Sequence, residues 1–391
     1  MDGVELVDVT KRFEDVTAVD GVSLSVRDGE FFTIVGPSGC GKSTTLRMIA
    51  GFEEPTEGRI EIAGTDVTDQ PPDDRDVGLV FQSYALFPHM TAAENVGFGL
   101  RMQGVPEDER RDRVAAMLDL VDLPGVGDQS PDELSGGQQQ RIALARSLVV
   151  EPDVLLLDEP LSNLDKQLRE SLQIELKRIQ EETDVTTIHV THNQEEAMTL
   201  ADRMCVLDGG TVEQVDEPRA VYNRPETPFV SQFVGKSNVF PAAVRRVDGA
   251  VEVELDEEPS LRFRWSGAAD AEPLPGAGLL VLRPERLRLE RRSDSSVAGT
   301  DATTREGGSG PNGSVRGDSG SAERNEFPVT VLDHQFKGDK TRYELAVDGS
   351  SDSSLRLVAH GPDGFEVGER LTASVGTDEL IVVPESRAEA P

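Results

Sequence analysis

The sequence predicts an α/β domain with a mainly parallel sheet, followed by a smaller all-β domain. Two short apolar runs, Phe31–Val35 and Val154–Leu157, indicate the first domain, because unbroken runs are typical of strands covered on both faces. Beyond about Gly235, regularly spaced short strand patterns with turns between them indicate the second domain. With 391 residues, the chain has room for both.

A glycine-rich loop, GPSGCGKST, joins the first apolar run to a stretch of helical periodicity. A strand, a glycine loop and a helix start together make a nest of N–H groups at the positive end of a helix dipole. In this pattern the amides hold the phosphates of a nucleotide, Lys42 reaches the β- and γ-phosphate oxygens, and the Ser43 hydroxyl ligates Mg²⁺. A glycine turn with a chance lysine is the weaker alternative, given the flanking elements. The predicted nucleotide-binding residues are Gly36, Pro37, Ser38, Gly39, Cys40, Gly41, Lys42, Ser43 and Thr44.

Polar residues follow two further predicted strands. Asp158 and Glu159 come directly after Val154–Leu157, and His192 follows the β-rich run Thr187–Thr191. Ligands of open α/β sheets bind at the carboxyl ends of the strands, where the glycine loop also lies. There Asp158 would hold Mg²⁺, Glu159 would activate water as a general base, and His192 would reach the γ-phosphate. An isolated acidic pair is more often a helix cap, but the shared position favours a catalytic site.

A second helix start with glycines lies at Leu134–Gln138, which reads LSGGQ. Ser135 is a candidate N-cap, and Gly136 and Gly137 would let an anion approach the N-terminus of the helix that follows. The alternative is an ordinary capped helix with a glycine-rich start. An anion-binding helix start so far from the first one predicts an occupant of its own.

The phosphate loop, Gln82, LSGGQ, VLLLDEP, SNLD and His192 together resemble the nucleotide-binding subunits of ABC transporters, over roughly residues 1–235. The resemblance implies an ATPase with an attached helical subdomain on a P-loop fold. It also implies an ATP-dependent head-to-tail homodimer, in which Ser135, Gly136, Gly137 and Gln138 of one chain contact the γ-phosphate held by the other.

The resemblance assigns further residues by position. It implies that Phe13 stacks on adenine, although an aromatic after a strand is also compatible with a core position. Gln82 would touch Mg²⁺ or the lytic water, and residues 162–165, which end at Asp165, would cross to the second chain. This loop usually reads SALD in the family, so Asn163 is a small departure. The segment after Gln82 would dock on a membrane permease, with Tyr84, Leu86, Phe87 and Met90 as candidate contacts, unless they are core residues.

The domain boundary predicted from composition separates residues 1–235 from residues 236–391. The second part resembles the TOBE accessory domain, an OB-like small barrel, and LRPERLRL at Leu282–Leu289 looks like its characteristic strand. Residues 293–326 contain seven Gly and seven Ser but no Leu, Ile or aromatic residue, which predicts a disordered insertion. The predicted strands are Val239–Val247, Ala250–Leu255, Leu261–Trp265, Leu279–Arg283, Leu287–Glu290, Phe327–Leu332, Arg342–Val347, Ser354–Ala359, Leu371–Val375 and Leu380–Val383.

The charge of the chain limits its partners. A formal net charge of −34 argues against nucleic acid and anionic lipid as partners. Of the 39 basic residues only seven are lysines, and acid-rich, lysine-poor chains resemble proteins of halophilic archaea. An acidic protein from a GC-rich genome is the alternative. Cys40 and Cys205 form no disulfide pattern, and no apolar run is long enough to span a bilayer, which together predict a cytoplasmic protein. The resemblance to ABC transporters implies a peripheral position at the cytoplasmic face of the membrane.

These features favour the ATPase subunit of an ABC importer, which works with separate permease subunits and an extracellular solute-binding protein. A soluble ABC ATPase without a transport role is the alternative class, but residues 45–133 are too few for the long coiled coil of DNA-maintenance members. A catalytically inactive subunit is disfavoured because Lys42, Asp158, Glu159 and His192 are all present. The sequence resembles polyamine and ferric-iron importers most, thiamine importers also have close variants, and a sugar importer is the alternative.

Overall fold

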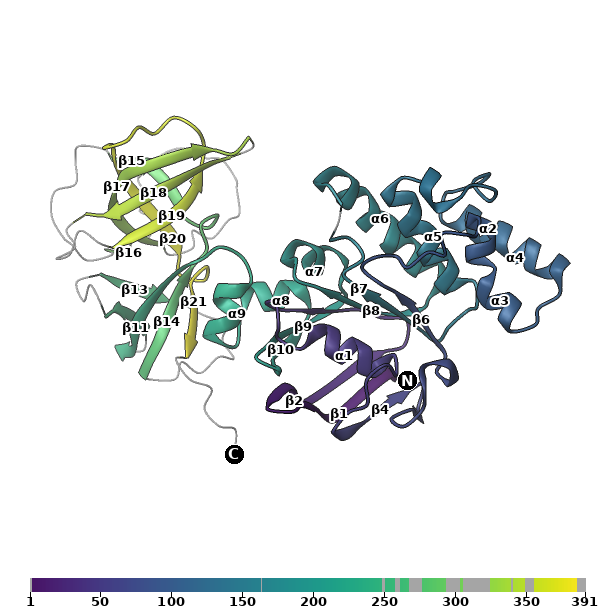
Figure 1. Ribbon diagram of the computed structural model, residues 1–391. Coiled ribbons are helices and arrows are strands. Elements are labelled where there is room, and N and C mark those ends of the chain that lie inside the picture. The colour runs from purple at the N-terminus through teal and green to yellow at the C-terminus, as the bar shows by residue number, and fades with distance from the viewer. Residues whose placement is uncertain are drawn as a thin grey trace, which may run out of the picture. The chain divides into compact units, whose positions relative to one another are not determined.

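The computed structural model describes residues 2–162, 164–247, 250–256, 261–266, 276–292, 303–304, 324–338, 340–348 and 355–384. The chain divides into two compact units, Met1–Val221 and Tyr222–Pro391. Helices accompany sheets in the first unit, whereas the second consists mostly of strands (Figure 1). The predicted order, an α/β domain followed by a β-rich domain, is therefore confirmed.

The central sheet of the first unit has six strands. In sheet order they are β10 (Thr211–Asp216), β9 (Arg203–Asp208), β3 (Phe31–Val35), β8 (Thr186–Thr191), β7 (Val154–Asp158) and β6 (Val77–Val80). All neighbours are parallel except β10, which runs antiparallel to β9 at the edge. Every residue of β3 and β8 is buried, as expected for strands covered on both faces.

The first unit also contains a second, antiparallel sheet. Its strands are β2 (Val16–Arg27), β1 (Asp2–Phe13), β4 (Glu57–Ile62) and β5 (Thr65–Asp66) in that order. One hydrophobic cluster joins this sheet, helix α1 (Lys42–Ile49) and one face of the central sheet, through residues such as Leu6, Leu46 and Leu156. Since α1 begins directly at the glycine loop, this cluster fixes the loop to the sheet.

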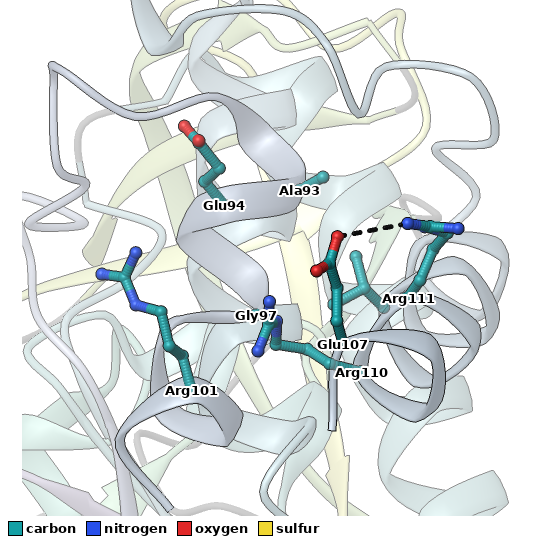
Figure 2. Close-up of a pocket in the computed structure, with 8 residues that line it drawn as sticks. Ala93, Glu94, Gly97, Arg101, Glu107, Arg110 and Arg111 are labelled. Carbon is teal, nitrogen blue, oxygen red and sulfur yellow. Dashed lines mark hydrogen bonds and ion pairs between the residues drawn. The ribbon is translucent and has the colours of Figure 1, made fainter. Parts of the chain in front are cut away.

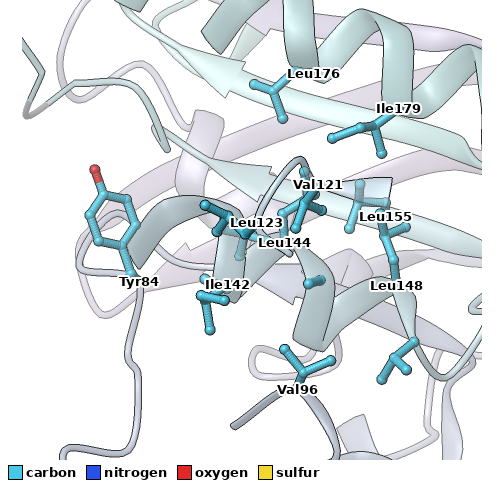
Figure 3. Close-up of a cluster of buried hydrophobic side chains, with 14 of the residues drawn as sticks. Tyr84, Val96, Val121, Leu123, Ile142, Leu144, Leu148, Leu155, Leu176 and Ile179 are labelled. Atoms are coloured by element: carbon cyan, nitrogen blue, oxygen red, sulfur yellow. The ribbon is translucent and has the colours of Figure 1, made fainter. Parts of the chain in front are cut away.

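The remaining helices of the first unit pack with one another and, through α5 and its neighbours, on the other face of the central sheet. They are α2 (Ala92–Val96), α3 (Phe98–Met102), α4 (Glu107–Leu120), α5 (Gly136–Leu148), α6 (Lys166–Thr183) and α7 (Gln194–Leu200). A 3-10 turn at Pro131–Glu133 precedes α5, and another at Pro72–Asp74 lies beside the end of α1. A second core cluster joins α2, α4, α5 and α6 to Leu155 and Leu157 of β7 (Figure 3). Leu156 lies between these two leucines and packs in the first cluster, because successive strand residues point to opposite faces. In the described part of the chain, no helix has the length and apolar character needed to cross a membrane.

The strands of the second unit form two sheets. The first contains β13 (Arg262–Trp265), β12 (Ala250–Leu255), β11 (Asn238–Val247), β14 (Gly276–Leu282) and β21 (Ile381–Pro384). The second contains β15 (Arg288–Arg291), β20 (Arg370–Gly376), β17 (Arg324–Phe336), β18 (Thr341–Val347) and β19 (Arg356–Gly361), and β16 (Thr303–Thr304) pairs with β17. The two sheets share one core, in which the rings of Phe263 and Phe327 meet edge to face with centroids 5.5 Å apart. The strands expected as a small barrel are thus arranged as two sheets on a common core.

Residues 222–235 belong with the second unit by their contacts, although composition placed a boundary near residue 235. This segment contains the end of α8 (Pro218–Asn223) and α9 (Pro228–Phe233). The fully buried Arg283 holds it: Nη1 donates to the carbonyl oxygen of Val234 at 2.6 Å, and Nη2 donates to that of Tyr222 at 2.8 Å. A buried guanidinium needs such acceptors, which ties the segment to the β-rich unit.

Most of the predicted insertion, residues 293–302 and 305–323, lies outside the described residues. Its last part was predicted wrongly, because β17 begins at Arg324 and not at Phe327. The reason is Asn325, whose side chain is buried and bonds both the N–H and the carbonyl oxygen of Arg264, at 2.7 and 2.9 Å. Because asparagine is common in loops, the sequence alone does not indicate that Asn325 lies in a strand.

Candidate active site

The loop between β3 and α1 surrounds the ammonium group of Lys42. Its Nζ donates to the carbonyl oxygens of Gly36 at 2.9 Å and of Pro37 at 2.8 Å, and the side chain is only 5% exposed. Cys40 is also buried in the loop, and burial raises the pKa of its thiol. Ser38 and Gly39 are exposed at the tip, and Thr44 is half-buried in the first turn of α1. The loop therefore curls around one cation, with its tip open to solvent.

Two glycines of this loop are required by sterics. A Cβ atom on Gly36 would lie 2.1 Å from the carbonyl oxygen of Leu207 in β9. Gly41 has φ +103°, and a Cβ atom there would lie 2.5 Å from the carbonyl oxygen of Ala18. Any side chain at these two positions would displace the backbone of a neighbouring strand, so their roles in the turn are independent of any ligand.

Ser43 and Asp158 meet beside the loop. The Ser43 hydroxyl donates to Oδ1 of Asp158 at 3.1 Å. Burial raises the pKa of the Asp158 carboxyl, and the Ser43 hydrogen bond and the charge of Arg47 oppose that rise without cancelling it. A hydroxyl and a carboxylate are oxygen donors of the kind that Mg²⁺ prefers, and a nearby cation would relieve the cost of burying the carboxylate. The residues present thus fit a magnesium ion.

Glu159 and His192 are in direct contact at the ends of β7 and β8. Oε2 of Glu159 lies 3.0 Å from Nδ1 of His192. Glu159 has φ +46°, a left-handed conformation that is uncommon outside glycine, and its N–H donates to the carbonyl oxygen of Val190 at 3.0 Å. Sequence reasoning expected both residues at strand ends, and the structure brings their side chains together. Such backbone conformations cluster at active sites, although eight other non-glycine residues among those described here also have positive φ.

Gln82 is connected to the same group through Ser162. Its Nε2 donates to Oγ of Ser162 at 3.1 Å, and that hydroxyl donates to the carbonyl oxygen of Glu159 at 2.9 Å. Gln82 comes two residues after the end of β6, the neighbour of β7 in the sheet. The strand order therefore brings together residues that are far apart in the sequence.

LSGGQ lies at the start of α5, in the cluster of helices and not at the phosphate loop. Ser135 Oγ accepts from the N–H of Gln138 at 3.4 Å, and Gln138 Oε1 accepts from the N–H of Ser135 at 2.9 Å, which is a capping box. Gly137 allows α6 to approach, since a Cβ atom there would lie 3.1 Å from Leu168. Ser135 and Gly136 are exposed. The expected cap is present, and the exposed start of the helix stays open to a partner.

Two other predicted residues lie on other elements, α6 and β1. Asp165 is the N-cap of α6, and its Oδ1 accepts from the N–H of Leu168 at 3.0 Å. Phe13 ends β1 and is 41% exposed, with the Lys11 ammonium 4.8 Å from its ring centroid. The exposed ring is inconsistent with the alternative that Phe13 is an ordinary core residue. Tyr84 was a candidate for permease docking unless it was a core residue. It is buried in the helical core (Figure 3).

Sequence reasoning missed a polar cluster behind His192. The carboxylate of Glu196 is buried and contacts Thr191, Asn193 and Arg169. An Asn at the helix start with Glu three residues later resembles a capping box and could have drawn attention to this carboxylate. A cavity of about 430 Å³ opens here. Its lining residues are Ser162, Arg169, Thr191, His192, Asn193, Gln194, Glu195 and Glu196.

The chain matches known families in both units. The family described as ABC transporter matches residues 19–162, and the family described as TOBE domain matches residues 280–383. The chain is 48% identical over 374 residues to the spermidine/putrescine import ATP-binding protein PotA of Pseudomonas aeruginosa, covering 95% of this chain and 96% of that one. It is 53% identical over 295 residues to the PotA protein of Acidothermus cellulolyticus, covering 73% and 76% of the two chains.

Solved structures are similar to the first unit. The dimeric ATP-binding cassette MJ0796, in a post-hydrolysis state bound to ADP and Pi, is 36% identical with a TM-score of 0.50, and the match covers 55% of this chain and 99% of that one. CbiO1 from Clostridium perfringens, part of the ABC transporter complex cbiONQ, is 30% identical with a TM-score of 0.53 over 56% and 90% of the two chains. With the full-length relatives, these matches establish that the chain belongs to the family of ABC transporter ATP-binding proteins, which hydrolyse ATP.

Proposed function

We propose that this chain is the ATP-hydrolysing subunit of an importer for polyamines such as spermidine and putrescine. The similarity to the Pseudomonas aeruginosa protein, which continues through both units, supports this cargo. The observation that carries the catalytic part is the contact between Glu159 and His192 at adjacent strand ends. The chain would be a peripheral subunit at the cytoplasmic face of the membrane, held there by the permease.

ATP binding would use the loop between β3 and α1. The Lys42 ammonium, which bonds two carbonyl oxygens of the loop, would exchange these acceptors for β- and γ-phosphate oxygens. Phe13 would stack on the adenine ring with its exposed face. Ser43 and Asp158 would hold Mg²⁺ together with phosphate oxygens and Gln82, and the bound ion would neutralise charge developing on the phosphates.

Hydrolysis would depend on the groups that follow β7 and β8. Glu159 would accept a proton from the attacking water, whose oxygen bonds to the γ-phosphorus while the bridging oxygen leaves with ADP. His192 contacts the Glu159 carboxylate through Nδ1, and as an imidazolium it would carry a second N–H, on Nε2, that could donate to a γ-phosphate oxygen. The two side chains would thus place the water and the phosphate relative to each other.

A second copy of the chain would complete each site. The exposed start of α5 offers backbone N–H groups and the Ser135 hydroxyl, which accepts one bond in the cap and keeps its own proton for donation. The solved cassette to which the first unit is similar is dimeric. Closure would bring Ser135, Gly136 and Gly137 to the γ-phosphate held by the other copy, with residues 162–165 at the interface.

The permease would dock on the helical part of the first unit. A groove of about 320 Å³ lies between α2–α3 and α4, and contains Arg101, Arg110 and Arg111 (Figure 2). Arg111 is paired with Glu107 at 3.3 Å, and Arg110 Nη1 donates to the carbonyl oxygen of Val105 at 3.3 Å. With Glu94 and Glu107 also in the lining, the groove carries both signs of charge, which fits a polar permease segment that contains an acidic residue. The full lining is Ala93, Glu94, Gly97, Arg101, Glu107, Arg110, Arg111 and Val114.

Uptake by cells tests the proposed cargo. The gene would be deleted from its host, and the uptake of labelled spermidine, putrescine and a sugar would be measured before and after complementation with the natural chain or with Glu159→Gln. We expect polyamine uptake to be lost and to return only with the natural chain. Loss of sugar uptake alone would show that the transported solute is a sugar and not a polyamine. Unchanged uptake of all solutes would favour a soluble ABC ATPase with another role.

A further inference from the structure

Glu196 holds the loop that carries His192 from both sides. Its carboxylate is 2% exposed, near the start of α7. Oε2 accepts from the Thr191 hydroxyl at 2.7 Å, and Oε1 accepts from the Asn193 side-chain amide at 3.0 Å. The Thr191 hydroxyl also accepts from the N–H of Asn193 at 3.0 Å. The residues immediately before and after His192 are therefore fixed to one buried carboxylate.

Arg169 connects the same carboxylate to the loop after Glu159. Its Nε lies 3.6 Å from Oε1 of Glu196. Its guanidinium also donates to two carbonyl oxygens in that loop, to Leu164 at 2.9 Å and to Leu161 at 3.4 Å. Arg169 and Glu196 both line the cavity of about 430 Å³ next to His192. One ion pair thus spans the two loops that carry Glu159 and His192.

This arrangement is more than a helix cap requires. A carboxylate at such a depth is costly unless it is paired and fully hydrogen-bonded, and a neutral cap residue would satisfy the first turn of α7 without that cost. In addition, the cap of α7 is already made by Asn193, whose Oδ1 accepts from the N–H of Glu195 at 2.9 Å. The carboxylate of Glu196 contacts the side chains of Thr191, Asn193 and Arg169. Its Oε2 also lies 3.9 Å from Nε2 of His189, a buried residue of β8. These contacts join α7 to the end of β8 and to α6, beyond what the cap of α7 needs.

We propose that Arg169 and Glu196 are positioning residues for ATP hydrolysis, which set His192 against Glu159 through Thr191. The inference rests on the proposed roles of Glu159 and His192. Catalytic groups need placement within a fraction of an ångström, and a shift of about 1 Å can cost about a hundredfold in rate. Since residues 162–165 are expected at the dimer interface, the pair also provides a path by which a change in that loop reaches His192.

The test uses Thr191 because it can be changed without altering its shape. Thr191→Val removes the hydroxyl that Glu196 accepts from and keeps the branched side chain, whereas Thr191→Ser keeps the hydroxyl. We expect Thr191→Val to lower kcat for ATP hydrolysis about tenfold or more, with KM for ATP within about twofold of the natural chain. Thr191→Ser should restore most of the turnover. A purely structural role would instead lower Tm in parallel with kcat, and serine would restore both together.

Coupling between the two loops is tested with Arg169→Ala. If the pair acts as one unit, Arg169→Ala combined with Thr191→Val should lose no more turnover than the worse single variant. In the Glu159→Gln background, each variant should still form the ATP-dependent dimer in sedimentation. Turnover of Thr191→Val within twofold of the natural chain, additive losses, or loss of that dimer would overturn the inference. If His192→Ala itself retains full turnover, the proposed role of His192 fails first.

Discussion

Nδ1 of His192 lies 3.0 Å from Oε2 of Glu159, and this contact joins the ends of two adjacent parallel strands. The histidine side chain is 55% exposed and the glutamate 20%, so the pair contributes little to stability, about 1 kcal/mol at most. Its value lies in placement. It fixes a basic carboxylate and a ring N–H donor relative to each other, next to the loop that holds Lys42.

Glu159→Gln should abolish turnover without abolishing ATP binding. Loss of a general base costs about 10²–10⁴-fold, and the isosteric amide keeps the contact with His192. Phosphate release should fall by that factor, and sedimentation with ATP and Mg²⁺ should show a stable dimer. Glu181→Gln, an exposed position on α6, is the matched control and should behave like the natural chain. Turnover retained in Glu159→Gln would exclude Glu159 as the base.

Gly136→Ala should separate the role of LSGGQ from folding. A Cβ atom there would meet only Leu164, at an ordinary 3.8 Å, and alanine favours a helix over glycine, less strongly at this first position than in a helix interior. The free chain should therefore keep or raise its Tm and bind ATP normally, while the ATP-dependent dimer and hydrolysis are lost. Gly36→Ala should instead lose ATP binding together with stability, because its Cβ atom would lie 2.1 Å from Leu207. Normal hydrolysis by Gly136→Ala would contradict a phosphate at this helix start.

Phe13→Ala should raise KM for ATP more than it lowers kcat. Stacking of this kind contributes about 1 kcal/mol, which corresponds to about a fivefold change in affinity. The ring is exposed at the end of β1, so its removal should leave Tm nearly unchanged. Phe336 is also exposed but lies in the second unit, so Phe336→Ala provides the control. An unchanged KM would remove Phe13 from the adenine site.

The fold could be predicted well where the pattern of side chains follows burial. Unbroken apolar runs predicted β3 and β7. The glycine loop predicted the start of α1, because local steric constraints determine which residues can form this turn. The burial of Arg283 and Asn325, and the hydrogen bonds of their side chains, were not predicted. Both are polar residues buried by partners distant in the sequence, and such partners leave no local pattern.

The same distinction applies to the site. Strand ends predicted where Asp158, Glu159 and His192 lie, since parallel strands bring their carboxyl ends to one edge. The sequence could not predict that Glu196 is buried, because its neighbours in QEEAM are typical of an exposed helix start. Only the packing of α6 against α7, which brings Arg169 to this carboxylate, reveals its role.

Asp158→Asn should stabilise the metal-free chain at neutral pH while abolishing hydrolysis. Burial raises the pKa of Asp158 in the folded state, so the folded chain binds a proton more readily than the unfolded chain does. Stability is therefore lost as the pH rises through the raised pKa, and the neutral amide avoids that loss. Thermal unfolding from pH 4 to 8 without Mg²⁺ should show the Tm advantage of the variant growing with pH. A difference in Tm that does not change with pH would contradict the raised pKa of Asp158.

Salt should raise both the activity and the stability of the chain. A net charge of −34 imposes repulsion among surface carboxylates, and salt screens it, with a Debye length of about 3 Å at 1 M. The similar proteins described above do not bear out a halophilic origin, so this stays a prediction from composition. ATP hydrolysis and Tm measured from 0.1 to 3 M KCl should rise into the molar range. Best activity at low salt would leave an acidic protein from a GC-rich genome as the better account of the seven lysines and 32 arginines.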